Sequence, residues 1–192
     1  SKADGSFVTQ GDLLVERVVM DLAKKHLTDA VVISEEGALD LGSDFRGWVL
    51  VVDPIDGTEN FTAGLPEWGV SISCYLDSSH VGSLLAAPEL GQWLCTGDMV
   101  KKHRSRIRGL SSSLDKEQIL QVGTGPEYRM IGCCVVNMMA VIRGSYLSFE
   151  NPKGANSWDI LAGLNLALEH GLHGEANGNG DSGDSLPHGK SD

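Results

Sequence analysis

Basic residues are scarce in this sequence. Of its 192 residues, 15 are Lys or Arg and 26 are Asp or Glu, which gives a formal net charge of −11 with histidine counted as neutral. Binding to nucleic acid polymers generally requires a basic surface, so this balance argues against that class of partner. We interpret the one basic cluster, Lys101–Arg108, as a solvated loop or edge strand rather than a phosphate-binding patch. A small anionic substrate remains compatible with the acidic charge if metal ions supply positive charge locally.

Long apolar runs and paired cysteines are also lacking. No apolar run approaches the roughly 20 residues of a membrane-spanning helix, and Ser1–Ser6 contains no apolar segment typical of a signal peptide. The four cysteines form no C-x-x-C pair: Cys74, Cys95, Cys133 and Cys134. Buried reduced thiols are therefore expected. Together these absences predict a cytoplasmic protein with no membrane partner.

The length and the hydrophobic fraction of 41% suit one folded domain with a real core. We predict that this domain covers residues 1–171. From Leu172 onward the chain is rich in Gly, Asn, Asp and Ser, and Leu186 is its only apolar anchor after Leu172. We interpret residues 172–192 as a disordered tail.

Hydrophobic spacing predicts alternating helices and strands. Helical spacing covers Leu13–His26, which Thr9 can cap, Gly132–Ile142, and a stretch from Ser157 to Gly171. The predicted strands are Ala30–Ser34, Trp48–Val52, Gly69–Tyr75, Val81–Ala87, Gly91–Thr96, Ile119–Val122 and Tyr146–Glu150. The third, fourth and fifth of these strands are close in sequence and should form an antiparallel meander. The segment Arg104–Ser113 is ambiguous.

The segment Asp53–Phe61 directly follows the predicted buried strand Trp48–Val52. The chain is expected to turn at Pro54 and Gly57, so that Asp53 and Asp56 emerge together at a strand end. Carboxylates held close repel one another, and a hard divalent cation is the usual remedy. The alternative is a plain surface turn, which Asp-Pro and Asp-Gly dipeptides often make. Taken alone, the segment fits both interpretations.

Five acidic positions stand out by context: Asp12, Glu35, Asp53, Asp56 and Asp159. Asp12 and Asp159 lie at helix starts, and Glu35 lies with Glu36 at a strand end. Asp159 alone is better explained by helix capping. Strand ends and helix N-termini gather ligands in α/β folds, so these acids can converge. Oxygen ligands suit Mg²⁺ or Mn²⁺ rather than zinc, for which the cysteines and histidines show no spacing pattern.

The order of these acids along the chain resembles the inositol monophosphatase family. The matching pieces are Lys2–Asp12 with Glu16, Glu35–Gly37, Asp53–Phe61, Gly64–Pro66 with Val70–Ile72, and Ser157–Gly163. The resemblance spans about residues 2 to 171. It implies a mixed α/β (α+β) fold, a layered αβαβα sandwich. It also implies lithium-sensitive hydrolysis of phosphate monoesters by about two or three Mg²⁺ ions.

The resemblance also implies a role for each matching residue. The metal ligands would be Glu35, Asp53, the carbonyl of Ile55, Asp56 and Asp159. Thr58 and Glu35, with Asp12 nearby, would orient and deprotonate the attacking water. The backbone N–H groups of Gly57 and Thr58 would receive the phosphate, and Glu150 would contact substrate hydroxyls.

We therefore expect a phosphoric monoester hydrolase that acts on a small polyol or sugar phosphate such as inositol monophosphate, and a homodimer is compatible with the family. The segment Gly64–Pro66 favours this substrate class, whereas the lead-in Lys2–Ser6 favours a nucleotide 3′-phosphatase of the same superfamily. The sequence is shorter than the family pattern at both ends and between Gly97 and Arg129. This motivates a third hypothesis, a non-catalytic metal-binding or interaction relative.

Overall fold

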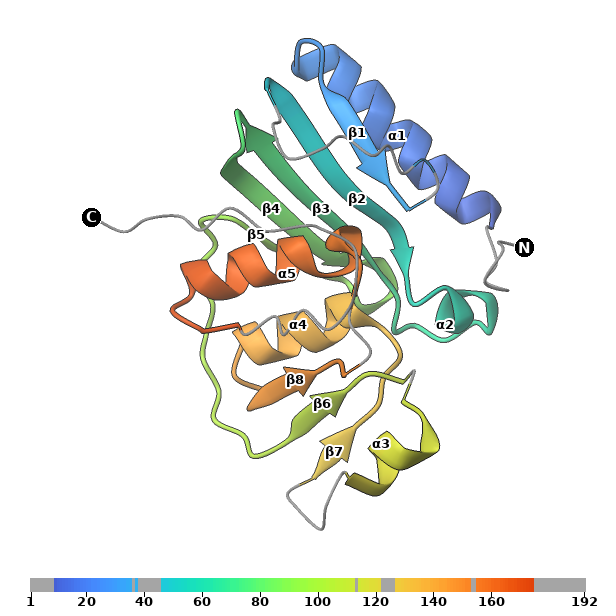
Figure 1. Ribbon diagram of the computed structural model, residues 1–192, viewed down its shortest axis with the longest axis vertical. Helices are drawn as coiled ribbons and strands as arrows, with labels where there is room; N and C mark the ends of the chain where they lie inside the picture. The colour runs from blue at the N-terminus through green and yellow to red at the C-terminus, as the bar shows by residue number, and fades with distance from the viewer. Residues whose placement is uncertain are drawn as a thin grey trace.

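The computed structural model describes residues 9–35, 37, 46–112, 114–121, 127–152 and 155–174. Within these residues, two sheets alternate with layers of helices (Figure 1). Several predictions lie outside the described residues: the lead-in Lys2–Ser6, Glu36 and the tail from residue 175. None of the helices in the described ranges is both long and apolar enough to cross a membrane.

The larger sheet has five strands in the order β1-β2-β3-β4-β5. Their bounds are Val31–Ser34, Trp48–Asp56, Gly69–Leu76, Ser79–Ala87 and Gln92–Cys95. Strand β1 runs parallel to β2, and each later strand pairs antiparallel with the one before it. The predicted meander is therefore confirmed. The β3–β4 hairpin turns at Asp77 and Ser78, whose φ angles of 47° and 64° match the right-handed strand twist.

Helix α1 (Gln10–His26) covers one face of this sheet, and helices α4 (Cys134–Ile142) and α5 (Ser157–Glu169) cover the other (Figure 1). The predicted cap of α1 is confirmed, because the Thr9 hydroxyl accepts hydrogen bonds from the N–H groups of Gly11 and Asp12. The main core lies between α4, α5 and strands β4 and β5. Its fully buried members include Leu85, Leu94, Met139, Ile142 and Leu166.

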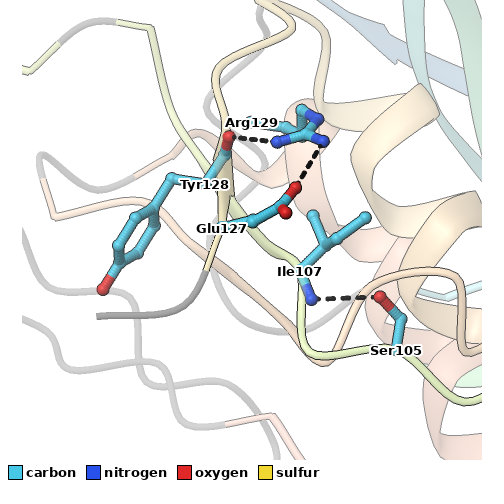
Figure 2. A network of polar contacts seen from close by, with 5 residues as sticks. All are labelled: Ser105, Ile107, Glu127, Tyr128 and Arg129. Atoms are coloured by element: carbon cyan, nitrogen blue, oxygen red, sulfur yellow. Dashed lines mark hydrogen bonds and ion pairs between the residues drawn. The ribbon is translucent and has the colours of Figure 1, made fainter. Parts of the chain in front are cut away.

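The smaller sheet has three parallel strands in the order β7-β6-β8. They are β6 (Arg108–Leu110), β7 (Tyr128–Arg129) and β8 (Ser148–Glu150). Figure 2 shows how the start of β7 is held: the Arg129 guanidinium donates to the Glu127 carboxylate and to the Tyr128 carbonyl. Helix α3 (Lys116–Gln121) lies at the outer end (Figure 1). Helices and two sheets therefore form the predicted mixed α/β fold.

Two local predictions were wrong. Ile119–Gln121 belong to α3 rather than to a strand, because the run Lys116–Gln121 consists of good helix formers and its apolar residues stay exposed, Leu120 by 74%. The chain also does not turn at Pro54. Strand β2 runs on to Asp56, and its pairing with β3 is irregular between Asp53 and Asp56, since proline has no N–H to donate.

The turn comes at Gly57, whose φ is 83°. It leads directly into α2 (Thr58–Thr62), and a further short helix, η1 (Pro88–Leu90), connects β4 to β5. Asn60 of α2 donates from Nδ2 to the carbonyls of Glu67 (2.7 Å) and Ile131 (2.8 Å). This side chain therefore links α2 to the loop before α4, which places the end of β2 close to the start of α4.

Candidate functional site

A cavity of about 240 Å³ opens where β1, β2, α2, the start of α4 and the start of α5 meet. Four carboxylates are among its lining residues, and together we call them the acidic wall: Glu35, Asp53, Asp56 and Asp159. The lining also includes side chains without charge, which together we call the neutral wall: Ser111, Ser112, Cys133, Asn137, Phe149 and Asn151. Ile55 near the end of β2, and Gly57 and Thr58 directly after this strand, line the cavity as well.

The topology explains how the acidic wall forms. Strands β1 and β2 are parallel neighbours, so Glu35 after β1 and Asp53 near the end of β2 lie at the same edge of the sheet. Asp159 lies in the first turn of α5. This turn is held against the sheet by Trp158, which packs on the core of β1 and β2 and whose carbonyl accepts a hydrogen bond from the Ser71 hydroxyl. The structure therefore brings residues from three distant segments to one cavity.

Burial and mutual repulsion dominate the electrostatics of the acidic wall. Asp53 is 2% exposed, and this burial, followed by the charges of Asp56, Asp159 and Glu35, raises its pKa well above the ordinary value. Burial also raises the pKa of Asp56 to about 6, although hydrogen bonds from Cys133 and Val135 partly oppose the shift. The charged forms of Asp53 and Asp56 are thus disfavoured in the cavity, which is the condition that a bound cation relieves.

Hydrogen bonds at the end of β2 orient the Asp53 carboxylate and the Ile55 carbonyl, two of the predicted metal ligands. The Ile55 N–H donates to Asp53 Oδ1 (3.1 Å), and the Thr58 hydroxyl donates to the Ile55 carbonyl (3.1 Å). At the other edge, Asp159 Oδ2 accepts a hydrogen bond from the Asn156 N–H (2.8 Å). Asp159 therefore does cap α5, as the local interpretation predicted, and it lines the cavity as well.

The donor types suit a hard cation, since carboxylate and carbonyl oxygens are the ligands that Mg²⁺ and Mn²⁺ prefer. The present side-chain positions do not complete such a site. In the described part of the chain, no group of three or more His, Cys, Asp or Glu side chains is arranged so that it could hold a metal ion. The chemistry of these residues thus fits a hard cation, and the carboxylates would have to move closer together to bind it.

Two predicted site residues are not among those that line the cavity. Asp12 is 1% exposed, and its Oδ2 accepts hydrogen bonds from the Thr9 N–H and hydroxyl, both at 2.7 Å, as part of the capping box of α1. Glu150 is half-exposed in β8 and pairs with Arg108 at 3.1 Å. Its neighbours Phe149 and Asn151 do line the cavity. The proposed roles of Asp12 and Glu150 therefore stay predictions.

The neutral wall was not predicted from the sequence. Its one readable signal is Asn137, a polar residue in the otherwise apolar helix Cys134–Ile142. Asn137 is 1% exposed, and its Nδ2 donates to the Cys133 carbonyl (2.7 Å). Among the described residues its Oδ1 has no hydrogen-bond partner. A buried amide in an apolar stripe could have been flagged, whereas Ser111, Ser112 and Asn151 carry no such pattern.

Comparison with known proteins finds a family model and several relatives that match this chain. The model of the inositol monophosphatase family matches residues 1–110. A Thermotoga maritima protein named fructose-1,6-bisphosphatase/inositol-1-monophosphatase is 28% identical over 182 residues, covering 85% of this chain and 69% of that protein. The Nus factor SuhB of Salmonella typhimurium is 38% identical over 193 residues, covering 88% of this chain and 72% of that protein.

Solved structures agree on the fold. An IMPase/NADP phosphatase crystallised with Mg²⁺ and phosphate superimposes with a TM-score of 0.76 at 16% identity, covering 89% of this chain and 71% of that one. The Thermotoga maritima IMPase gives a TM-score of 0.72 at 24% identity, covering 87% and 70%. The predicted resemblance is confirmed: this chain belongs to the inositol monophosphatase family.

Proposed function

We propose that this chain is a Mg²⁺-dependent phosphomonoesterase that hydrolyses a small polyol or sugar phosphate. The observation that carries the proposal is the cavity itself, whose lining combines four carboxylates with uncharged polar side chains. The acidic wall supplies the oxygen atoms for cations that would in turn attract a phosphate group. Membership of a family of phosphomonoesterases supports the same reaction class.

Mg²⁺ would be held by Glu35, Asp53, the Ile55 carbonyl, Asp56 and Asp159. When bound, it lowers the pKa of a coordinated water and neutralises charge on the phosphate oxygens. The Thr58 hydroxyl already donates its proton to the Ile55 carbonyl, so its lone pairs are left to accept a hydrogen bond from the attacking water. Glu35 is the carboxylate assigned to take the proton of that water. The N–H groups of Gly57 and Thr58 would receive the phosphate.

The neutral wall supports the substrate class. Hydroxyl and amide side chains such as Ser111, Ser112 and Asn137 complement uncharged hydroxyl groups. Among the described residues that line the cavity, no side chain is basic, so none offers an ion pair to a second phosphate. This favours a polyol monophosphate over a bisphosphorylated nucleotide.

The test is phosphate release from inositol 1-phosphate and, separately, from adenosine 3′,5′-bisphosphate, each with and without Mg²⁺. We expect release from inositol 1-phosphate that requires Mg²⁺ and falls on addition of Li⁺. Asp159→Asn should abolish it, whereas Asp21→Asn, a matched change on the exposed face of α1, should not. A marked preference for the nucleotide would reject the substrate class, and activity without any divalent cation would reject the mechanism.

A second candidate is a non-catalytic relative. Two observations favour it: the 38% identity to a protein named as a Nus factor, and the lack of an arranged metal-ligand cluster among the described residues. It predicts no Mg²⁺-dependent phosphate release from any of a panel of monoesters. Mn²⁺ titration then distinguishes its two forms, since a metal-binding relative should still bind the cation in this cavity, whereas an interaction relative without a metal site should not.

A further inference from the structure

Cys133, at the start of α4, makes an unusual contact with the acidic wall. Its thiol donates a hydrogen bond to Asp56 Oδ2, with 3.0 Å between sulfur and oxygen. The Val135 N–H donates to the same oxygen at 2.5 Å. One carboxylate oxygen is therefore held by two donors from the first turn of α4, 77 and 79 residues further along the chain.

The thiol is the donor in its contact with Asp56. Cys133 is 2% exposed, and its sulfur atom lies 3.0 Å from the Asp56 carboxylate, which as an ionised group can only accept a hydrogen bond. The Val136 N–H also donates to the sulfur atom at 3.4 Å, which makes Cys133 the N-cap of α4. The sulfur is thus fixed by the helix on one side while its proton is directed at Asp56 on the other.

Close backbone packing enforces this contact. A Cβ added at Gly57, the residue after Asp56, would lie 3.1 Å from the Cys133 Cβ and 3.1 Å from the Gly132 carbonyl oxygen. The end of β2 and the start of α4 therefore approach as closely as a glycine allows. The backbone beside Asp56 is therefore held against the start of α4, which keeps its carboxylate within reach of the thiol.

We propose that Cys133 is a positioning residue whose buried thiol fixes the Asp56 carboxylate at the acidic wall. Its importance for turnover rests on the proposed function, because only there is Asp56 a metal ligand. Residues that orient a metal ligand typically change metal affinity by about 10- to 100-fold when they are removed. A hydroxyl can replace the thiol as donor, whereas a methyl group cannot. Cys133→Ser should therefore behave like the wild type, and Cys133→Ala should not.

Infrared spectroscopy tests the contact without metal or substrate. The wild-type minus Cys133→Ser difference spectrum isolates the S–H stretching band of Cys133 among the four cysteines. Asp56→Asn replaces a charged acceptor with a neutral one, and we expect the band to move to higher wavenumber as the hydrogen bond weakens. A band that stays in place would overturn the proposal. Asp21→Asn, far from the cavity lining, is the matched control and should not shift the band.

Mn²⁺ titration tests the consequence for the cation. Cys133→Ala should weaken Mn²⁺ binding about tenfold and raise the Mg²⁺ requirement for turnover by a similar factor, with kcat at saturating Mg²⁺ changed by no more than about twofold. Cys133→Ser should restore both, and Cys95→Ala, outside the cavity lining, should change neither. Equal Mn²⁺ affinity in wild type and Cys133→Ala would refute the positioning role. Absence of Mn²⁺ binding in the wild type would reject the proposed function, while the infrared shift still decides the contact.

Discussion

The two walls of the cavity differ in how they are built. The acidic wall uses Asp53 and Asp56 from a single motif at the end of β2, joined by Glu35 and Asp159. The neutral wall is assembled from the segment after β6, the start of α4 and the strand β8. One wall carries strongly repelling charge, and the other carries none.

The two walls differ in what they can contribute to the proposed function. Repelling carboxylates are unfavourable for folding unless a ligand compensates, so their presence together in a cavity favours a functional role for them. Uncharged polar groups are compatible with stability, and in the proposed function they would select the substrate rather than carry the reaction. Removing charge from the acidic wall should therefore abolish turnover, whereas changes at the edge of the neutral wall should alter substrate binding.

The largest expected effect comes from Asp53→Asn. Loss of a cation ligand should lower kcat/KM by at least about a hundredfold, corresponding to about 3 kcal/mol of transition-state stabilisation. The free energy of unfolding without Mg²⁺ should be equal or higher, because the neutral amide removes a buried charge that its neighbours repel. Phosphate-release kinetics and thermal unfolding measure both quantities. Near-normal activity in this variant would remove Asp53 from the catalytic site.

The pH dependence of stability without Mg²⁺ tests the charge of the acidic wall. Folding raises the pKa of Asp53 well above its ordinary value and that of Asp56 from 3.8 to about 6. The folded state therefore binds more protons than the unfolded state. Stability should be fully present below the ordinary carboxyl pKa and should fall as pH rises through about 6 for Asp56. Urea unfolding across this range measures the slope, and Mg²⁺ should restore stability at neutral pH. A flat profile would contradict the repulsion.

The junction between the walls is tested by Gly57→Ala. Gly57 has φ of 83°, and an added Cβ would lie 3.1 Å from two atoms of the loop before α4, so we expect a loss of about 2 to 4 kcal/mol in unfolding free energy. Gly64→Ala is the matched control, because Gly64 has φ of 76° but no atom within 4 Å of the added Cβ. It should cost about 1 kcal/mol. Equal losses in urea unfolding would show that packing between the walls is not tight.

The smallest effect is expected at Glu150, beside the neutral wall. Its ion pair with Arg108 is exposed, so Glu150→Ala should change stability by less than about 1 kcal/mol. If Glu150 contacts a substrate hydroxyl, KM should rise by roughly threefold with kcat unchanged, as loss of one hydrogen bond predicts. Glu127→Ala removes a similarly exposed ion pair, to Arg129, and serves as the control. An unchanged KM in Glu150→Ala would remove this residue from the substrate site.

Most of the fold could be predicted from local pattern. The helix beginning after Thr9 and the meander β3-β4-β5 follow from spacing and turn residues, which act over a few neighbouring positions. The prediction failed at Ile119–Gln121, where a short apolar pair fitted a strand as well as a helix. It also failed at Pro54, which remained inside β2 because the sheet tolerates an irregular pair there.

The acids of the acidic wall could be predicted from the sequence. Asp53 and Asp56 share one motif, and Glu35 and Asp159, which are ordinary acids in their local context, stand out because the order of all these acids along the chain resembles the family. The neutral wall depends on how distant segments pack. The contact of Cys133 with Asp56 spans 77 residues, and the burial of Asn137 depends on layers packing together. A hydrogen bond between distant segments leaves no periodic trace in the chain, so no local pattern could predict the Cys133 contact, and a polar residue in an apolar helix indicates burial without showing what it faces.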